Sequence, residues 1–208
     1  MKTSIAIIIV SFKSTALLAR CLECIAAQDT VISNILILDN GGKDLIPEDY
    51  ATRFPSIQIY KNNRNIGFAA GNNFLFQKIS SCEWIAFVNP DAYLQPDWLS
   101  KMLSATTAYP EYSFFASRLV QANHPESLDG DGDVMHISGL AWRDKHNHPV
   151  AYGAIKPCEM FSPCAAAALY RCDALQAAGA LEKISFYYGL YRYSLLEIYT
   201  GIFSFTDF

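Results

Sequence analysis

The sequence predicts an α/β fold in which an open, mostly parallel sheet is flanked by helices. Within the first 120 residues, short apolar runs alternate with longer segments of helix-like patterning. This alternation is typical of repeated strand–helix–strand units, whose crossovers place neighbouring strands parallel. The 208 residues, 51% of them hydrophobic, can bury a substantial core, so we expect one domain or a little more.

Each expected strand is a short apolar run that ends at residues unable to extend it. The first run, at residues 4–10, is short even for the apolar part of a secretion signal and is closed by Ser11 and Lys13, so we interpret it as a buried strand. Asn40-Gly41-Gly42 permits a tight turn after the second strand. Pro90 ends the fourth, because proline cannot continue a central strand. The strands are expected at residues 4–10, 33–39, 57–60, 84–88 and 113–119.

Segments with helix-like patterning connect these strands. After Gln121 the composition becomes polar and rich in Asp, Gly and His, so we expect loops there and a β-hairpin around residues 137–144. Order returns at residues 161–178. No stretch approaches the roughly 20 apolar residues of a membrane-spanning helix. The helices are expected at residues 15–28, 71–80 and 97–109, with another beginning at Arg171.

The charge balance limits the partners of the chain. Sixteen Lys and Arg against twenty Asp and Glu give a net charge of −4. Such a chain has no overall basic field to hold nucleic acid or an anionic membrane. We therefore expect no nucleic-acid partner and at most peripheral membrane association. Because the first apolar run is interpreted as a strand and no membrane span is found, we expect by default a cytoplasmic location that includes the inner face of the membrane.

Six cysteines are scattered through the chain and are expected to be reduced and mostly packed in the core. A chain of this size does not need disulfides, and a free cysteine behaves as a small buried hydrophobe. Cys21 and Cys24 form a CxxC pair, but no second pair accompanies it, so zinc or redox use is not expected. The other four are Cys82, Cys158, Cys164 and Cys172.

The polar middle of the chain carries histidines and aspartates that could suggest a metal site. The histidines have no recurring ligand spacing, so we expect them to be solvated. The aspartates of residues 129–133 lack the sixth-position glycine and distal glutamate of an EF-hand calcium loop, so we expect a turn-rich face in contact with solvent. The histidines are His124, His136, His146 and His148.

Residues suited to ligand binding follow four of the expected strands. Ser11 and Phe12 follow the first, Asp39 ends the second, and residues 62–71 and 89–91 follow the third and fourth. In open α/β sheets, ligands bind beyond the carboxyl ends of the strands, near the point where strand order reverses. We therefore expect the four segments to meet at one edge of the sheet.

These segments have a chemical use for a nucleotide-diphosphate sugar. The Phe12 ring can stack on a pyrimidine, and Asp39 can accept a hydrogen bond from a base N–H or a ribose hydroxyl. Gly67 and Gly71 let the backbone approach a ligand closely. Asp91 offers a hard oxygen ligand for Mg²⁺ or Mn²⁺, which would neutralise charge on the leaving group. The structural alternatives are a core aromatic at Phe12, a turn residue at Asp39, and an N-cap or turn residue at Asp91.

Residues 65–73, Asn-Ile-Gly-Phe-Ala-Ala-Gly-Asn-Asn, resemble the NxGFAxGNN motif of family 2 glycosyltransferases, especially their rhamnosyltransferase-like branch. Val10-Ser11-Phe12, Leu38-Asp39-Asn40 and Asn89-Pro90-Asp91 agree with that family in order and spacing. The resemblance covers residues 4–179 and implies the GT-A type nucleotide-diphospho-sugar transferase fold, with its Rossmann-like sheet. It implies Asp91 as the metal ligand of a DxD-type motif that has Asn89 in first position. The implied nucleotide-sugar contacts are Val10, Ser11, Phe12, Asp39, Asn65, Gly67, Phe68, Gly71, Asn72, Asn89 and Asp91.

The resemblance implies an inverting, metal-assisted transfer of a sugar in cell-envelope polysaccharide synthesis. The donor would be dTDP- or UDP-linked, with rhamnose as the sugar of this branch, and the acceptor a saccharide or lipid-linked saccharide. Residues 1–183 would form the glycosyltransferase domain, with nucleotide-sugar binding in residues 1–120 and the acceptor side in residues 121–183. A nucleotide-dependent oxidoreductase is disfavoured, because no GxGxxG follows the first strand.

The resemblance stops after Leu181. Relatives continue with an acidic ED-x-D motif, and an inverting transfer needs such a carboxylate to deprotonate the acceptor hydroxyl. Glu182 and Glu197 have the wrong neighbours, so no catalytic residue is assigned. Residues 184–208 form an atypical tail, which we interpret as a truncation or reading-frame shift near Ile184. The alternative function is a catalytically inactive nucleotide-sugar-binding fragment.

Overall fold

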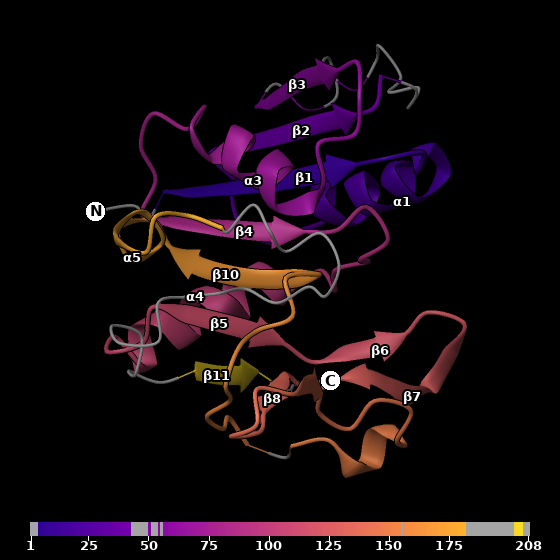
Figure 1. Ribbon diagram of the computed structural model, residues 1–208, viewed down its shortest axis with the longest axis vertical. Coiled ribbons are helices and arrows are strands. Elements are labelled where there is room, and N and C mark those ends of the chain that lie inside the picture. The colour runs from indigo at the N-terminus through magenta and orange to yellow at the C-terminus, as the bar shows by residue number, and fades with distance from the viewer. Residues whose placement is uncertain are drawn as a thin grey trace.

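The computed structural model describes residues 4–42, 50, 54, 56–154, 156–181 and 202–205 of the chain. Within these residues, seven strands form one sheet that carries helices on both faces, so the expected α/β fold is confirmed (Figure 1). In spatial order the strands are β11 (Ile202–Phe205), β5 (Phe114–Ser117), β10 (Ala167–Arg171), β4 (Trp84–Val88), β1 (Ile5–Ser11), β2 (Asn34–Asn40) and β3 (Ile57–Asn62).

Parallel pairing predominates in this sheet. β1 pairs in parallel with β2 and β4, β2 with β3, and β11 with β5, whereas β10 is antiparallel to both β4 and β5. The antiparallel β10 returns the chain from the polar middle region into the centre of the sheet. The described helices are α1 (Thr15–Ala26), α3 (Phe68–Phe76), α4 (Trp98–Ala108) and α5 (Cys172–Ala177), with a short 3₁₀ helix, η1, at Val150–Tyr152.

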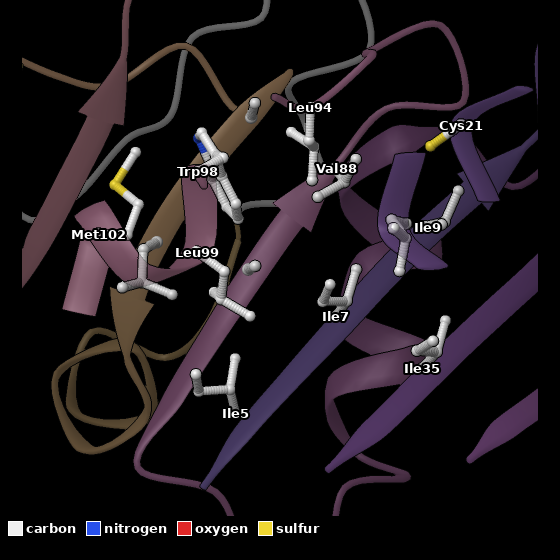
Figure 2. Packing of buried hydrophobic residues seen from close by; sticks show 14 of the residues in the cluster. Ile5, Ile7, Ile9, Cys21, Ile35, Val88, Leu94, Trp98, Leu99 and Met102 are labelled. Atoms are coloured by element: carbon white, nitrogen blue, oxygen red, sulfur yellow. The ribbon is translucent and has the colours of Figure 1, made fainter. Parts of the chain in front are cut away.

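Strand β1 contributes to two hydrophobic cores because its successive side chains point to opposite faces of the sheet. Ile5, Ile7 and Ile9 pack with residues of α1 and α4, as Figure 2 shows. Ile8 packs on the other face with residues of α3 and α5. Burial on both faces explains why this strand is a continuous apolar run rather than an alternating one.

Helix α3 lies closer to the sheet than an ordinary helix could, because it contains a glycine at the contact. A Cβ atom on Gly71 would lie 2.9 Å from Cγ1 of Val10 and 3.2 Å from Cδ2 of Leu38. The helix also begins at Phe68, three residues before the expected start, directly after Gly67 with its φ of 86°. The close packing of α3 on β1 and β2 therefore gives position 71 a structural reason to be glycine, and the expected contact of Gly71 with ligand stays a prediction.

The polar region after β5 contains more strand than the sequence predicted. The strand expected at residues 113–119 is divided into β5 and β6 (Leu119–Gln121), and β7 (His124–Gly130), predicted as loop, pairs with β6. The predicted hairpin is present as β8 (Asp133–Met135) paired with β9 (Ala141–Arg143). Polar strands of this kind belong to small, partly exposed sheets, where the apolar runs that reveal buried strands are absent.

The expectation that every cysteine is reduced was wrong for two of the six. Cys82 and Cys172 form a disulfide across a sequence separation of 90 residues. The antiparallel pairing of β10 with β4 places Arg171 opposite Trp84, which brings the adjoining cysteines together. Cys21, Cys24, Cys158 and Cys164 are free thiols.

Among the described residues, no helix has the length and apolar character needed to cross a membrane.

Candidate functional site at the carboxyl edge of the sheet

The four segments singled out in the sequence lie at one edge of the sheet. β1, β2, β3 and β4 run parallel, so their carboxyl ends are on the same side (Figure 1). The strand register pairs Ser11 with Asp39, and Asp39 with Lys61. β4 ends at Val88, immediately before Asn89-Pro90-Asp91. The fold thus assembles the edge expected from the sequence.

Two of the predicted binding residues at this edge are buried strand residues. The side chains of Ser11 and Asp39 are both shielded from solvent at the ends of β1 and β2. Asp39 is therefore part of the strand and not of the turn that follows it. Because both residues lie at the ends of their strands, a ligand can contact them only at the carboxyl edge of the sheet.

Phe12 is exposed, which excludes the core-aromatic alternative. Its side chain is 41% accessible to solvent and follows the last residue of β1. The Nζ atom of Lys13 lies 5.2 Å from the ring centroid. Gly41 lies against the ring, because a Cβ there would approach Cδ2 of Phe12 to 3.0 Å. The ring is thus partly exposed at the edge, next to a cation and against the turn that follows β2.

Asn40 organises the loop between β3 and α3, a role that the sequence had not revealed. Its side-chain Nδ2 donates to Oδ1 of Asn65 at 2.9 Å and to the carbonyl oxygen of Gly67 at 3.2 Å. Its Oδ1 accepts a hydrogen bond from the backbone N–H of Ile66 at 3.0 Å. Asn65 Oδ1 also accepts from the N–H of Gly67. Asn40 therefore fixes the loop that carries the predicted contacts Asn65 and Gly67.

The predicted contacts within α3 have structural partners. Asn72 is buried and donates its amide to the carbonyl oxygen of Phe68, one turn earlier. Phe68 itself packs against the core that α3 shares with the sheet. Both residues thus hold the first turn of α3 in place behind the edge. A direct contact with nucleotide stays a prediction for them, as it does for Val10.

Asn73, which the sequence had not singled out as a contact, ties α3 to the end of the described domain. Its side-chain Oδ1 accepts a hydrogen bond from the N–H of Leu181 at 2.8 Å, and its Nδ2 donates to the Leu181 carbonyl. One amide thus satisfies both backbone groups of a residue 108 positions later. The available signal was the second asparagine of the motif at residues 65–73.

The turn that carries Asp91 accepts a hydrogen bond from Cys21 of α1. The Cys21 thiol donates to the carbonyl oxygen of Asn89 at 3.5 Å, and the N–H of Asn89 donates to the carbonyl oxygen of Ala166 at 2.8 Å. The pKa of the Cys21 thiol is raised to about 12, mainly by burial and to a smaller extent by the Cys24 thiol and the Asp91 carboxylate. Cys21 is therefore a protonated thiol, and the expectation of a structural role is supported.

The chemistry of Asp91 fits a divalent metal that is shared with a bound diphosphate. The residue is exposed directly beyond the β4 end. Within the described part of the chain, no group of three His, Cys, Asp or Glu side chains could hold a metal ion by itself. Mg²⁺ is often bound by one or two carboxylates together with substrate phosphates. Asp91 can supply the protein oxygen of such a site.

Asp131, expected on a solvent-facing turn, is buried in an ionic cluster. Its carboxylate lies 3.4 Å from Nε of Arg118 and 3.0 Å from Nζ of Lys145, and it accepts a hydrogen bond of 2.7 Å from the N–H of Ala154. The solvent-face interpretation was therefore wrong for this residue. Its charge is compensated by basic residues 13 and 14 positions away, a pairing that short-range sequence patterns do not show.

The pKa of Asp131 predicts a pH-dependent stability. Burial raises the pKa, but the Ala154 N–H, the Lys145 ammonium and the Arg118 guanidinium outweigh it and hold the pKa below its ordinary value. The stabilisation should thus be complete above the unfolded pKa of about 3.9 and disappear as pH falls through the lower folded pKa.

Asp131→Asn should lower the free energy of unfolding by about 3 kcal/mol at pH 7, since it leaves two cations without their buried partner. Urea unfolding from pH 7 to acid should show this difference shrinking as pH falls. Asp129→Asn, at a more exposed ion pair with Arg143, is the matched control and should have a smaller effect. An equal loss in both variants, or a loss at Asp131 that does not depend on pH, would contradict the prediction.

Comparison with known families identifies the family of the chain. The sequence model of the family described as Glycosyl transferase family 2 matches residues 6–178 of the chain. The chain belongs to this family. The matched range includes all four segments of the carboxyl edge and the whole β6–β9 region. No curated protein matches the chain in sequence.

Solved glycosyltransferases share the fold. *S. aureus* TarS 1–349 superposes with a TM-score of 0.70 at 15% identity, covering 99% of this chain and 59% of its own. GalNAc-T7 with UDP, GalNAc and Mn²⁺ gives 0.72 at 10% identity, covering 97% and 42%. The *Pyrobaculum calidifontis* mannosyltransferase PcManGT with GDP-Man and Mn²⁺ gives 0.56 at 14% identity, covering 88% and 48%. This glycosyltransferase chain has the α/β GT-A fold and spans about half the length of these structures.

Two expectations fall on residues that the structure does not describe. The acidic motif expected after Leu181, and most of the tail at residues 184–208, lie outside the described residues. Within the tail, the backbone of β11 pairs in parallel with β5. The proposed boundary at residue 183 and the interpretation of a truncation or frame shift therefore stay predictions.

Proposed function

We propose that this family 2 glycosyltransferase chain binds a nucleotide-diphosphate sugar at the carboxyl edge of β1–β4 and transfers the sugar to a saccharide acceptor. The observation that carries the proposal is the assembly of four separate segments at one edge, with Phe12 and Asp91 exposed there. The structures of GalNAc-T7 and PcManGT, which share the fold, contain UDP or GDP-Man together with Mn²⁺.

Each edge residue has a role that its position allows. The Phe12 ring stacks on the base, and Asp39 accepts a hydrogen bond from the base or the ribose at the end of β2. The loop held by Asn40 presents the backbone of Asn65 and Gly67 to the donor. Asp91 binds a Mg²⁺ or Mn²⁺ ion, and such an ion, when bound, neutralises charge on the leaving diphosphate.

The finer assignments follow from the branch that the motif at residues 65–73 resembles. They are a dTDP- or UDP-linked donor with rhamnose as the sugar, inversion at the anomeric carbon, and a saccharide or lipid-linked acceptor in cell-envelope polysaccharide synthesis at the cytoplasmic face of the membrane. Nucleotide-sugar binding belongs to residues 1–120 and the acceptor side to residues 121–183.

A second candidate function is a donor-binding fragment without turnover. The observation that favours it is the sequence after Leu181, which lacks the acidic motif of relatives. Inverting transfer requires a base near the acceptor hydroxyl, because that hydroxyl must lose its proton close to the transition state. Without a base the chain would bind the donor and release it unchanged.

Thermal unfolding with nucleotides tests donor binding under either function. UDP or dTDP with Mn²⁺ should raise the melting temperature, because a ligand at 100 times its Kd stabilises the folded state by about 2.7 kcal/mol. The same nucleotides with EDTA are the control and should give a smaller shift. If neither UDP nor dTDP changes the melting temperature with Mg²⁺ or with Mn²⁺, the proposal is wrong.

Release of free nucleotide from UDP- or dTDP-sugars separates the two functions. Transfer to an acceptor, or hydrolysis of the donor, releases the diphosphate at a rate proportional to the protein concentration. Such release would exclude the inactive fragment. Binding without release, with and without saccharide acceptors, would instead exclude turnover by this chain.

A further inference from the structure

The β8–β9 region contains a second concave surface. It is an open depression of about 690 Å³, which we call the Trp142 pocket. The pocket is formed within a single stretch of chain and does not include the residues of the carboxyl edge. Its lining residues are Trp142, Arg143, Asp144, Lys145, His146 and His148.

The wall of this pocket is held in one shape by backbone hydrogen bonds. Asp144 N–H donates to the carbonyl of Gly132 at 2.8 Å, and its own carbonyl accepts from Asp131 N–H at 3.0 Å. Lys145 and Asn147 have φ values of 54° and 62°, a left-handed conformation uncommon for residues other than glycine. Such strain persists only where the surroundings fix the backbone, and it occurs often at binding sites.

Trp142 provides an aromatic face in this pocket. Its side chain is 50% exposed, whereas Trp84 and Trp98 are buried in the core between the sheet and α4. A large aromatic side chain left half exposed in a concavity is typical of a binding site. The face of an indole attracts C–H groups that carry partial positive charge, as on one side of a pyranose ring.

The two histidines of the pocket offer hydrogen-bond acceptors. Nδ1 of His146 lies 2.7 Å from the carbonyl oxygen of Asp129, and Nδ1 of His148 lies 3.2 Å from the carbonyl oxygen of His146. Because a carbonyl oxygen can only accept, each Nδ1 carries the proton. Where a ring carries only that proton, its Nε2 can accept a hydrogen bond from a hydroxyl group.

The basic groups of the pocket are already paired with carboxylates. Lys145 lies 3.0 Å from Asp131 and 3.2 Å from Asp144, and Arg143 binds Asp129. The pocket therefore offers no surplus positive charge to a phosphate. An aromatic face, acceptor nitrogens and compensated charges together suit a neutral ligand that has both C–H faces and hydroxyl groups.

The chain leaves the sheet at its carboxyl edge before it enters this region. β10 is antiparallel to both β4 and β5, so β5 runs in the same direction as β4 and ends at the edge where the donor is proposed to bind. The chain passes from that end of β5 into β6 and on to the β8–β9 sheet (Figure 1).

We propose that the Trp142 pocket binds a neutral saccharide, with a pyranose ring stacked on Trp142 and its hydroxyls donating to Nε2 of His146 and His148. Its identity as the sugar acceptor rests on the proposed glycosyltransferase function. Binding of a saccharide to the pocket does not depend on that function.

Tryptophan fluorescence tests this proposal. Trp142 is the exposed member of the chain's three tryptophans, so its emission and its quenching by acrylamide report on the pocket. We expect at least one of four probes (methyl α-rhamnoside, lactose, maltotriose and diacetylchitobiose) to shift the emission and protect it from acrylamide. The shift of the emission and the protection from acrylamide should both saturate as the probe concentration rises.

Three variants locate the site. Isothermal titration measures how tightly each variant binds the probe that the unaltered protein binds. Trp142→Ala should weaken binding about tenfold, equivalent to about 1.4 kcal/mol, and Trp142→Phe should restore part of the loss. Leu140→Ala, at an exposed residue of the same hairpin, is the control and should bind as the unaltered protein does. Each variant's melting temperature checks its fold.

The proposal is overturned if no probe binds, or if Trp142→Ala binds as tightly as the unaltered protein. It is also overturned if inorganic phosphate displaces the bound probe, since that would assign the pocket to anions. Nucleotide-induced stabilisation is measured on the same samples. Nucleotide binding without saccharide binding rejects only this inference, and saccharide binding without nucleotide binding rejects only the proposed donor site.

Discussion

Replacing Asp91 with asparagine should lower the affinity for UDP or dTDP in Mn²⁺ on the order of a hundredfold, because a carboxylate that binds the metal contributes several kcal/mol through it. Asparagine keeps the shape of the side chain but carries no charge. The side chain is exposed, so the fold should not suffer. The loss should therefore appear in ligand binding and not in the stability of the unliganded protein.

Calorimetric titration of nucleotide in Mn²⁺, repeated in EDTA, measures this effect. The two proteins should bind alike in EDTA and differ only when metal is present. Asp97→Asn is the matched control, since Asp97 lies six positions later and forms an exposed ion pair with Lys101. Equal affinity of the Asp91 variant and the unaltered protein in Mn²⁺ would show that the metal is held elsewhere or not needed.

The parallel core of the fold was predictable because its strands are buried on both faces. Such strands are uninterrupted apolar runs, and β4 occupies the predicted residues 84–88. β2 ends at Asn40, directly before Gly41-Gly42, and β4 ends at Val88, two residues before Pro90. Since parallel strands end at one edge, the location of the site followed from the same pattern.

The remaining features depend on contacts between distant residues. The disulfide requires that β10 run antiparallel to β4, and no local pattern around Cys82 or Cys172 indicates this. The burial of Asp131 depends on Arg118 and Lys145, which reach it from different strands and turns. β7 lies in a small polar sheet and has neither an apolar run nor an alternating pattern. We therefore expected a loop at these residues.

At the site itself, the motif located the loop but did not assign its roles. The missing side chain of Gly71 makes room for Val10 and Leu38, a packing role that the motif did not indicate, and its contact with ligand stays a prediction. The amides of Asn40 and Asn73 connect elements that are adjacent only in the folded chain. Their side chains could be recognised as polar from the sequence, but their partners could be found only in the structure.

Asn40→Ala is expected to lower the free energy of unfolding by about 2 kcal/mol and to weaken nucleotide binding roughly tenfold. Asn40 is only 1% exposed, and its amide serves Asn65, Ile66 and Gly67. Removing it leaves the N–H of Ile66 without its acceptor. The loop would then no longer hold Asn65 and Gly67 at the edge.

Urea unfolding and nucleotide titration on the same variant separate the two effects. Asn63→Ala, at an exposed residue of the same loop, is the control and should change neither quantity appreciably. Asn40→Asp keeps the acceptor for Ile66 but places a buried carboxylate oxygen against the oxygens of Asn65 and Gly67, so it should destabilise the protein at least as much as Asn40→Ala does. A loss of stability with unchanged nucleotide affinity would restrict Asn40 to folding. The donor would then be positioned by Asp39, Phe12 and Asp91, and the loop at residues 65–67 would be a neighbour of the site and not part of it.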